Sequence, residues 1–496
     1  MRFFRFTKYV AFTAMLGLLG ACDDFLDVNQ SPNAVLAAPA PNVLVAAQSH
    51  LGFLMGSDIH RYSSLFVQQF SGQGGAGIQS AEYDRYNVTA TDMNNVWRTN
   101  IYGGALSDMQ KLIEQTQTNS PRYAGISKIM QAFTFAITTD AWGDIPFTDA
   151  LKFAGNVQPK YDKSDAVYTS ILALIDSGVE DLGKASDLSP LTDDLIYGGD
   201  LNKWRKLANT LKLRLYVHYY PKVSATATSN IATLIAQGPT NFISTAADNF
   251  QMDFAAVSNN ENPIHQFEGR RPNQFFPSST LVGLMNTKSD PRRATYFTAS
   301  PVAGQYTGAG NGTGASGAPS TAFSRMHTYL RGEATTVGTT TTYTGAAPIR
   351  MLIAPEYHFI LAEYYFRTGN VASATTSLTT GVRTSMQMAG VATTAIDTYV
   401  AGLPAQIAAY TASNGAEALL RAIIEEKYVA NFGVAVEPWT DWRRTKYPVL
   451  NPAANAVLPQ IPRVLPYSDL ERVANPTNTP ERSDLTAPAV FWDPGR

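Results

Sequence analysis

Cys22 is the residue whose chemistry the sequence defines most sharply, because it is the only cysteine among 496 residues. A single cysteine forms no internal disulfide and supplies no cysteine-rich zinc site. It follows Leu19-Gly20-Ala21, a pattern typical of a lipobox, in which diacylglycerol alkylates the cysteine thiol and the chain is then cleaved before it. The pattern predicts lipidation of Cys22. The alternative is an incidental cysteine at the end of an ordinary signal peptide.

Residues 1–21 are predicted to be the signal peptide of such a lipoprotein, because basic residues near the start precede a short apolar stretch. The stretch from Val10 to Ala21 is shorter than the roughly 20 residues of a membrane-spanning helix. Acyl chains on the new N-terminus would hold the mature chain to a membrane. Residues 22–41, rich in Asn, Ser, Pro and Ala, are predicted to be a tether, and residues 42–496 a single large domain.

No recognisable catalytic constellation is found in the sequence. It contains no H-E-x-x-H, no G-x-S-x-G and no P-loop, and its six histidines include no pair at metal-ligand spacing. His218 and His358 lie in amphipathic stretches and are interpreted as structural. We therefore predict no catalytic residue, no metal ligand and no cofactor. Glycoside hydrolysis stays open as an alternative, because it needs only two carboxylates and the chain has 40 acidic residues.

The composition favours an uncharged ligand. Only 16% of the residues are charged and the formal net charge is −2, which gives no reason to expect nucleic acid as a partner. Aromatic residues reach 11% of the chain, with 24 Tyr and 24 Phe. Exposed aromatic rings can lie against the apolar faces of a sugar while neighbouring polar groups bind its hydroxyls.

Two stretches combine aromatic rings with polar neighbours and are predicted to bind such a ligand. The first spans residues 71–97, where a Gly-rich loop precedes Tyr83, Tyr86 and Trp97. The second spans residues 265–279 and contains Arg270, Asn273, Phe275 and Phe276. The alternative is that each ring is buried in the core. For Trp97 this alternative is a core residue at the start of a helix.

The elements that must position these residues are mostly helices, and the fold class is predicted to be mainly α. Apolar residues recur at helical spacing over about 97–220 and again over about 355–432. Residues 355–382 match the inner positions of a tetratricopeptide (TPR) hairpin, with Gly369 at the turn. Between these regions, residues 240–350 are predicted to be a loop-rich insertion with short strands, including Gly- and Thr-rich tracts at 300–347.

Seven stretches together resemble the SusD/RagB-like outer-membrane lipoproteins of Bacteroidetes, and more closely their SusD-like branch. In chain order they are CDDFLDVNQSPN (22–33), VWRTNIYGGALSDMQKLIE (96–114), TTDAWGDIPFTDAL (138–151), DPRRATYF (290–297), EYHFILAEYYFRTGNVASA (356–374), IIEEKYVANFGVAVEPWTDWRRTKYP (423–448) and IPRVLPYSDLERVANP (461–476). Val464 and Ser468 depart from the usual form of the last motif. The order and spacing of the seven stretches carry the resemblance over nearly the whole chain.

The resemblance implies a scaffold of TPR-like helical hairpins whose irregular insertions carry the ligand face. It also implies a non-catalytic lipoprotein, anchored in the outer membrane and facing the cell exterior. Such a protein would deliver an oligosaccharide, or in some members a peptide, to a SusC-like TonB-dependent barrel. A surface glycan-degrading enzyme and a structural TPR adaptor are the competing classes. The motif residues Trp439, Trp442, Arg443 and Arg444 are interpreted as structural.

Overall fold

The computed structural model describes residues 38–74, 77–313 and 319–495, and the residues from Ala40 onward form one compact unit. The predicted signal peptide, the lipidation site Cys22 and nearly all of the predicted tether lie outside the described residues. Within the described part of the chain, no helix is both long enough and apolar enough to cross a membrane.

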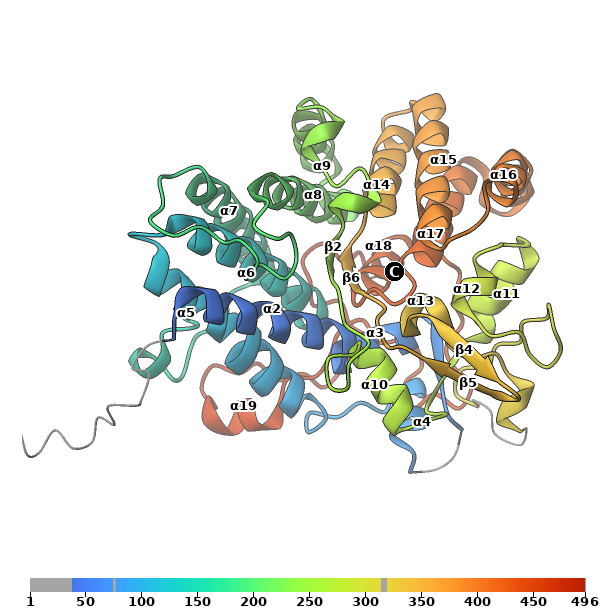
Figure 1. Ribbon diagram of the computed structural model, residues 1–496, viewed down its shortest axis with the longest axis horizontal. Helices are drawn as coiled ribbons and strands as arrows, with labels where there is room; N and C mark the ends of the chain where they lie inside the picture. Colours follow the sequence, from blue (N-terminus) through green and yellow to red (C-terminus); the bar gives the residue numbers. More distant parts are fainter. Residues whose placement is uncertain (1–37, 75–76, 314–318, 496) are drawn as a thin grey trace, which may run out of the picture. The chain divides into compact units, whose positions relative to one another are not determined.

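The unit is built mainly from α-helices, which confirms the predicted fold class. Figure 1 shows α5–α8 in teal to green and α14–α17 in orange as two groups of helices. The helices before the insertion are α2 (Ala40–Gly56), α3 (Asp58–Phe66), α4 (Gln79–Asp84), the π-helix η2 (Asn95–Leu106), α5 (Ser107–Thr116), α6 (Pro121–Trp142), α7 (Ser164–Leu182), α8 (Leu201–His218) and α9 (Tyr220–Ile235). Those after it are α14 (Ala354–Arg367), α15 (Val371–Met388), α16 (Thr393–Asn414), α17 (Ala418–Ala430), α18 (Glu437–Thr445) and α19 (Asp469–Ala474).

Helix α6 is the central helix of the first group, because it packs against both α5 and α7. Pro121 occupies its first turn, where the missing backbone N–H costs no hydrogen bond. The close approach of α6 to α7 depends on glycine. A Cβ atom on Gly125 would lie 2.7 Å from the carbonyl oxygen of Gly178. Small residues at this crossing therefore let the two backbones come together.

Helices α14 and α15 form the predicted TPR-like hairpin. Gly369 turns the chain with a φ of 79°, a conformation that favours glycine. The Asn370 side chain then caps α15 by accepting a hydrogen bond from the N–H of Ser373 (3.1 Å). Gly381 lies against the ring of Phe359, since a Cβ there would be 2.9 Å from the ring edge. A small residue on α15 thus lets the ring from α14 pack closely against it.

Two helices differ from the sequence expectation. The helical region expected from about residue 97 begins as a π-helix over Asn95–Leu106 and becomes an α-helix only from Ser107. The first helical region was expected to end at about residue 220, before Pro221, but Pro221 does not end helical structure. Instead it stands in the first turn of α9, which begins two residues after α8 ends, because proline is well tolerated at that position.

The insertion contains short helices and three two-stranded antiparallel sheets. The sheets pair β1 (Phe70–Gly72) with β3 (Phe275–Pro277), β2 (Phe250–Met252) with β6 (Ile349–Leu352), and β4 (Ala334–Val337) with β5 (Thr340–Tyr343). The helices of the insertion are α10 (Pro263–Arg270), α11 (Ser279–Thr287), α12 (Arg293–Tyr296) and α13 (Thr328–Arg331). Short 3-10 turns occur both inside and outside the insertion, as η3 (Phe153–Gly155), η4 (Pro239–Asn241), η5 (Ala246–Asp248), η6 (Ser320–Ala322) and η7 (Gly415–Glu417). Strand β1 comes from outside the insertion and ties it to the N-terminal helices.

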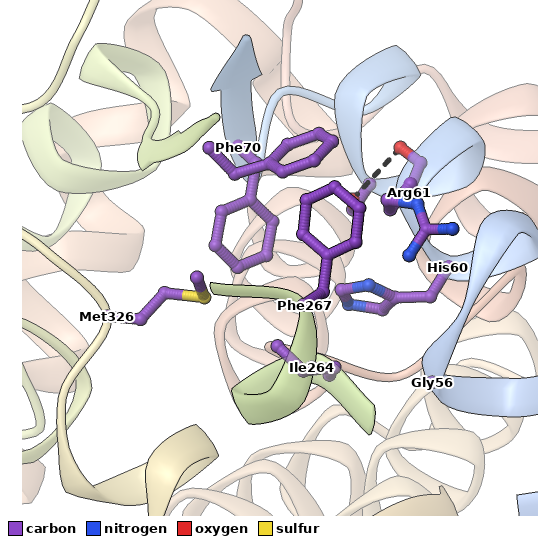
Figure 2. A pocket seen from close by; sticks show the side chains of 9 residues that line it. Gly56, His60, Arg61, Phe70, Ile264, Phe267 and Met326 are labelled. Carbon is purple, nitrogen blue, oxygen red and sulfur yellow. Dashed lines mark hydrogen bonds between the residues drawn. The ribbon is translucent and has the colours of Figure 1, made fainter. Parts of the chain in front are cut away.

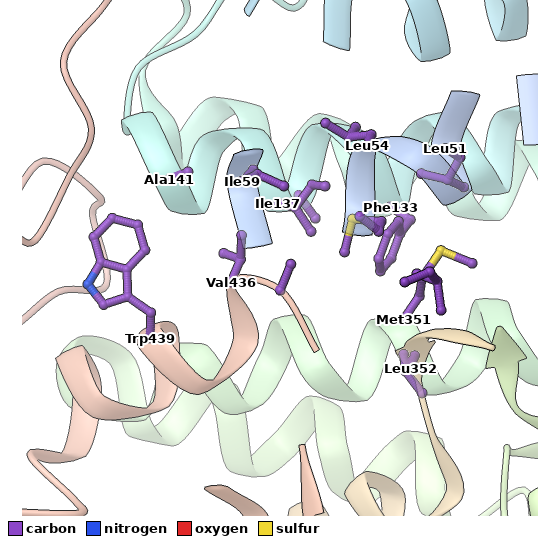
Figure 3. Packing of buried hydrophobic residues seen from close by; sticks show 14 of the residues in the cluster. Leu51, Leu54, Ile59, Phe133, Ile137, Ala141, Met351, Leu352, Val436 and Trp439 are labelled. Carbon is purple, nitrogen blue, oxygen red and sulfur yellow. The ribbon is translucent and has the colours of Figure 1, made fainter. Parts of the chain in front are cut away.

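The core joins segments from the whole length of the unit. Figure 3 shows side chains of α2, α3, α6, β6 and α18 packed in one apolar cluster. The labelled members are Leu51, Leu54, Ile59, Phe133, Ile137, Ala141, Met351, Leu352, Val436 and Trp439. Burial of this cluster fixes α18 against the N-terminal helices.

Buried charges link the same helices, which confirms the structural interpretation of Arg443 and Arg444. Arg443 donates to the backbone carbonyl oxygens of Asp140 (2.5 Å) and Arg463 (2.7 Å). Arg444 forms two hydrogen bonds of 2.6 Å to the carboxylate of Glu363, which joins α18 to α14. A buried charge needs such a partner, so these arginines are part of the scaffold.

Candidate ligand-binding site

The pairing of β1 with β3 brings together the two stretches predicted to bind ligand. In the ladder Gly72 lies opposite Phe275, and the Gln73 N–H donates to the carbonyl oxygen of Gln274 (2.8 Å). The side chain of Gln274 also donates to that of Gln73 (2.9 Å). Segments about 200 residues apart in the sequence are therefore neighbours in the fold.

An apolar pocket lies beside this ladder. It is a small cavity of about 20 Å³, room for one or two water molecules, and Figure 2 shows its walls, formed by α2, α3, β1, α10, β3 and the chain around Met326. The residues that line it are Gly56, His60, Arg61, Ser64, Phe70, Ile264, Phe267, Phe275 and Met326. Of the predicted ligand-binding residues, Phe275 is the one that lines this pocket.

Aromatic and cationic groups shape the pocket wall around Phe267. Its ring meets the ring of Phe275 edge-on at 5.5 Å between centroids. The Arg61 guanidinium lies 4.4 Å from the Phe267 ring centroid, and that of Arg271 lies 5.6 Å from it. Arg61 also forms an ion pair with Asp58 on the first turn of α3. These contacts hold the half-buried Phe267 ring in place at the edge of the pocket.

His60 is the one imidazole in the pocket lining, and Figure 2 shows its ring pointing between Phe267 and Ile264. The side chain is buried, and its Nε2 atom has no hydrogen-bond partner among the described residues. Burial, reinforced by the positive charge of Arg61, lowers the pKa of His60 to about 3. The imidazole is therefore neutral at neutral pH and offers an uncharged nitrogen to the pocket.

Tyr83 and Tyr86 lie close to this region but turn into the protein. The Tyr83 hydroxyl donates to the Asp92 carboxylate (2.7 Å), and its ring meets that of Tyr62 at 4.8 Å between centroids. Tyr86 has a φ of 69°, and its hydroxyl accepts the N–H of Ala453 (2.8 Å). Both side chains are buried. Ligand contact by either residue stays a prediction and would require these protein contacts to open.

The remaining predicted residues of the second stretch surround β3. Phe276 is buried with the Arg325 guanidinium 4.3 Å from its ring centroid. Asn273 accepts a hydrogen bond from Arg325 (2.5 Å), and Arg270 is exposed at the end of α10. Arg270 and Asn273 are thus placed where a ligand at the surface could meet them, whereas Phe276 is covered.

Trp97 lies apart from the pocket, in the π-helix η2. Its ring belongs to an aromatic cluster with Trp142 and Tyr102, at 5.3 and 5.0 Å between centroids. The ring is 2% exposed and forms part of the floor of a second, larger groove, which also includes the exposed residues Phe153 and Val473. The core position weighed for Trp97 from the sequence agrees with this burial.

The sequence argument did not select His60, Arg61 and Met326, which face the same pocket. They lie in segments far from residues 265–279, and only the folded chain brings them together. Phe267 stands inside the predicted stretch, but the adjacent pair Phe275 and Phe276 was the more evident signal there. In the part of the chain that the structure describes, no cluster of His, Cys, Asp and Glu could hold a metal ion.

Comparison with known proteins identifies the family. A family model described as SusD-like, "Starch-binding associating with outer membrane", matches residues 33–467. The chain belongs to the SusD-like family. The match spans nearly the whole chain and includes both helical groups and the insertion between them. A search of curated proteins found no significant match.

Solved structures of SusD homologues share the fold. A SusD homologue from Bacteroides uniformis is 23% identical, with 91% of this chain and 99% of that chain covered and a TM-score of 0.72. A chitin-binding SusD homologue from Flavobacterium johnsoniae is 19% identical, with 91% and 98% covered and a TM-score of 0.73. A chain described as a chitin-binding protein is 23% identical, with 92% and 100% covered and a TM-score of 0.75.

Proposed function

We propose that this protein is a non-catalytic lipoprotein of the outer membrane that binds a nutrient oligosaccharide at the cell surface. It delivers the oligosaccharide to a SusC-like TonB-dependent barrel. The observation that carries the proposal is the family match over residues 33–467, whose description joins starch binding to the outer membrane. The lipobox that ends at Cys22 supports attachment to that membrane by acyl chains, and more than one such chain gives stable anchoring.

The ligand class is proposed to be a neutral glycan. The low charge of the chain and the aromatic side chains around β1 and β3 suit an uncharged ligand better than an anionic one. Because two structural neighbours are described as chitin-binding, chitin oligosaccharides join starch oligosaccharides as the first ligands to test. A peptide ligand is the alternative within the same kind of uptake system.

The partner is tested by capture from the native membrane. The tagged full-length protein is extracted with a mild detergent, and the proteins that remain bound are identified by mass spectrometry. The proposal expects a large TonB-dependent outer-membrane protein in a near-equal amount. Recovery of the protein alone, at detergent concentrations that keep other membrane complexes together, would contradict the partner.

The enzyme alternative is tested on the same material. Incubation with starch and chitin oligosaccharides should return both unchanged, as judged by chromatography of the sugars. Shortened products that persist after further purification would replace the binding proposal with a glycan-degrading enzyme.

A further inference from the structure

The groove whose floor includes Trp97 is large enough to receive part of another molecule. It holds about 580 Å³, within the roughly 300–1,000 Å³ of sites that bind ligands. One wall is the π-helix η2 together with the start of α5, a second is the loop over residues 146–159, and a third is α19. The half-buried Tyr102 lies beside Trp97 at the floor.

Hydrogen bonds hold the loop of residues 146–159 against α19, so the groove is formed before anything binds. The Gln158 side chain donates to the carbonyl oxygen of Ala474 (3.0 Å). The Asn475 side chain donates to the carbonyl oxygen of Pro159 (2.8 Å). A preformed surface loses little conformational entropy on binding, which favours a specific partner.

Large apolar side chains stand exposed on the rim of the groove. Phe153 is 39% exposed, Leu470 is 43% exposed and Val473 is 79% exposed. The backbone has a φ of 61° at Leu151 and of 48° at Phe153, a conformation that residues other than glycine rarely adopt. The fold thus keeps a strained turn that presents a large apolar side chain to solvent, which is typical of a functional surface.

The groove also carries positive charge that this chain does not neutralise. Arg98 is exposed in its lining and forms no ion pair with the described residues. The Lys111 Nζ lies 5.8 Å from the ring centroid of Phe153 at the rim. Of the described residues that line the groove, only Glu471 carries a carboxylate, and that group already accepts a hydrogen bond from Tyr161 (3.3 Å). Arg98 is thus free to pair with an acidic group of a bound molecule.

Resting on the function proposed above, we infer that this groove holds the partner barrel, through a barrel loop that carries a large apolar side chain next to a carboxylate. The apolar side chain lies against Phe153 and Val473, and the carboxylate pairs with Arg98. Protein interfaces combine apolar, aromatic and arginine contacts in this way at their centres. A sugar suits the groove less well, because sugars lie against exposed ring faces, whereas Trp97 is 2% exposed and Leu470 and Val473 are aliphatic.

The test repeats the membrane capture described above with variants expressed in place of the unaltered chain. Val473→Glu places a negative charge on the apolar rim, and Arg98→Glu reverses the unpaired charge. Each should lower the amount of captured barrel about fivefold or more. The matched controls are Val371→Glu, at a helical valine that is 58% exposed, and Lys222→Glu, at an exposed lysine of α9. Neither control should change the captured amount, and an equal loss in the controls would overturn the inference.

Folding and glycan binding of the variants are checked on the mature chain with Cys22→Ser, which carries no acyl anchor. Val473→Glu and Arg98→Glu should melt within about 2 °C of the parent, because both side chains are exposed. Both variants should also bind glycan as the parent does. If either variant weakens glycan binding and leaves the barrel bound, the groove holds the sugar instead and the inference is overturned.

Photocrosslinking gives a second readout that needs no loss of binding. The photoreactive residue p-benzoyl-phenylalanine, in place of Phe153, keeps a ring at the rim and should crosslink to the barrel. The same residue in place of Val337, which is 76% exposed on β4, should not. Capture of the barrel by every variant, with no crosslink from position 153, would overturn the inference and leave the proposed function intact. If the unaltered protein captures no barrel, the proposed partner fails and the inference fails with it.

Discussion

Glu363 offers a sharp test of the buried charges that hold the scaffold together. Its carboxylate accepts two hydrogen bonds of 2.6 Å from Arg444 and one of 2.7 Å from Arg367. Burial by itself would raise the pKa of Glu363, but the charges of Arg444 and Arg367 outweigh it and lower the pKa from 4.5 to about 2. The carboxylate is thus strongly favoured in its charged form in the folded protein.

The magnitude follows from this difference in pKa. One pKa unit corresponds to about 1.36 kcal/mol, so a change from 4.5 to about 2 corresponds to about 3 kcal/mol of folding free energy at pH 7. Because the folded-state pKa is the lower one, this stabilisation is present above pH 4.5 and is lost as the pH falls toward 2. At pH 3, about 60% of it should be gone.

We therefore expect Glu363→Gln to lower the free energy of unfolding by about 3 kcal/mol at pH 7 and by only about 1 kcal/mol at pH 3. Urea unfolding followed by circular dichroism at both pH values gives the two differences, in which the titration of other carboxylates cancels. Glu180→Gln is the control, because Glu180 is exposed and pairs with the likewise exposed Lys184, and it should have little effect at either pH. The reasoning is refuted if Glu363→Gln costs the same at pH 7 and pH 3, or less than about 1 kcal/mol at pH 7.

Three further predictions concern other parts of the chain. Burial raises the pKa of Asp84 to about 6, so the folded protein favours the protonated carboxyl. The stabilisation from this protonation is full below pH 4 and is lost as the pH rises through 6. Carboxyl NMR should find the titration midpoint of Asp84 near pH 6, and a midpoint near 3.8 would contradict this. Gly312→Ala should destabilise the fold by more than about 3 kcal/mol in urea unfolding, since its φ is 81° and the added Cβ would overlap the Ala454 carbonyl oxygen. Gly338→Ala, at a φ of 61° in open space, should cost only about 1–2 kcal/mol, and equal costs would refute the argument. Cys22→Ser should abolish incorporation of labelled palmitate and release the protein from the membrane fraction; labelling that persists would place the lipid elsewhere.

The helical scaffold could be predicted because its signals are local. Pro121 at the start of α6 and Gly369 at the turn between α14 and α15 act within a few residues of their own position. Helical spacing of apolar residues is likewise read within a single segment. The π-helix over Asn95–Leu106 escaped this reading, since its period differs from the one that was assumed.

The site could be predicted only in part, because it depends on contacts between distant segments. The types of residue in stretches 71–97 and 265–279 selected two segments that lie together in the fold, but the β1–β3 ladder that joins them leaves no local signal. Whether a ring faces solvent or core is also decided by the folded neighbours. Tyr86 and Phe276, for instance, are covered by segments that come from elsewhere in the chain.

The central claim, that the chain binds a glycan without degrading it, is tested most directly by calorimetric titration. The mature chain with Cys22→Ser is titrated with starch and chitin oligosaccharides, and the sugars are recovered and sized afterwards. The account predicts a saturable isotherm for at least one oligosaccharide, with the sugar returned at its original length. Shortened sugar, or binding that is found for peptides and for neither glycan, would contradict it.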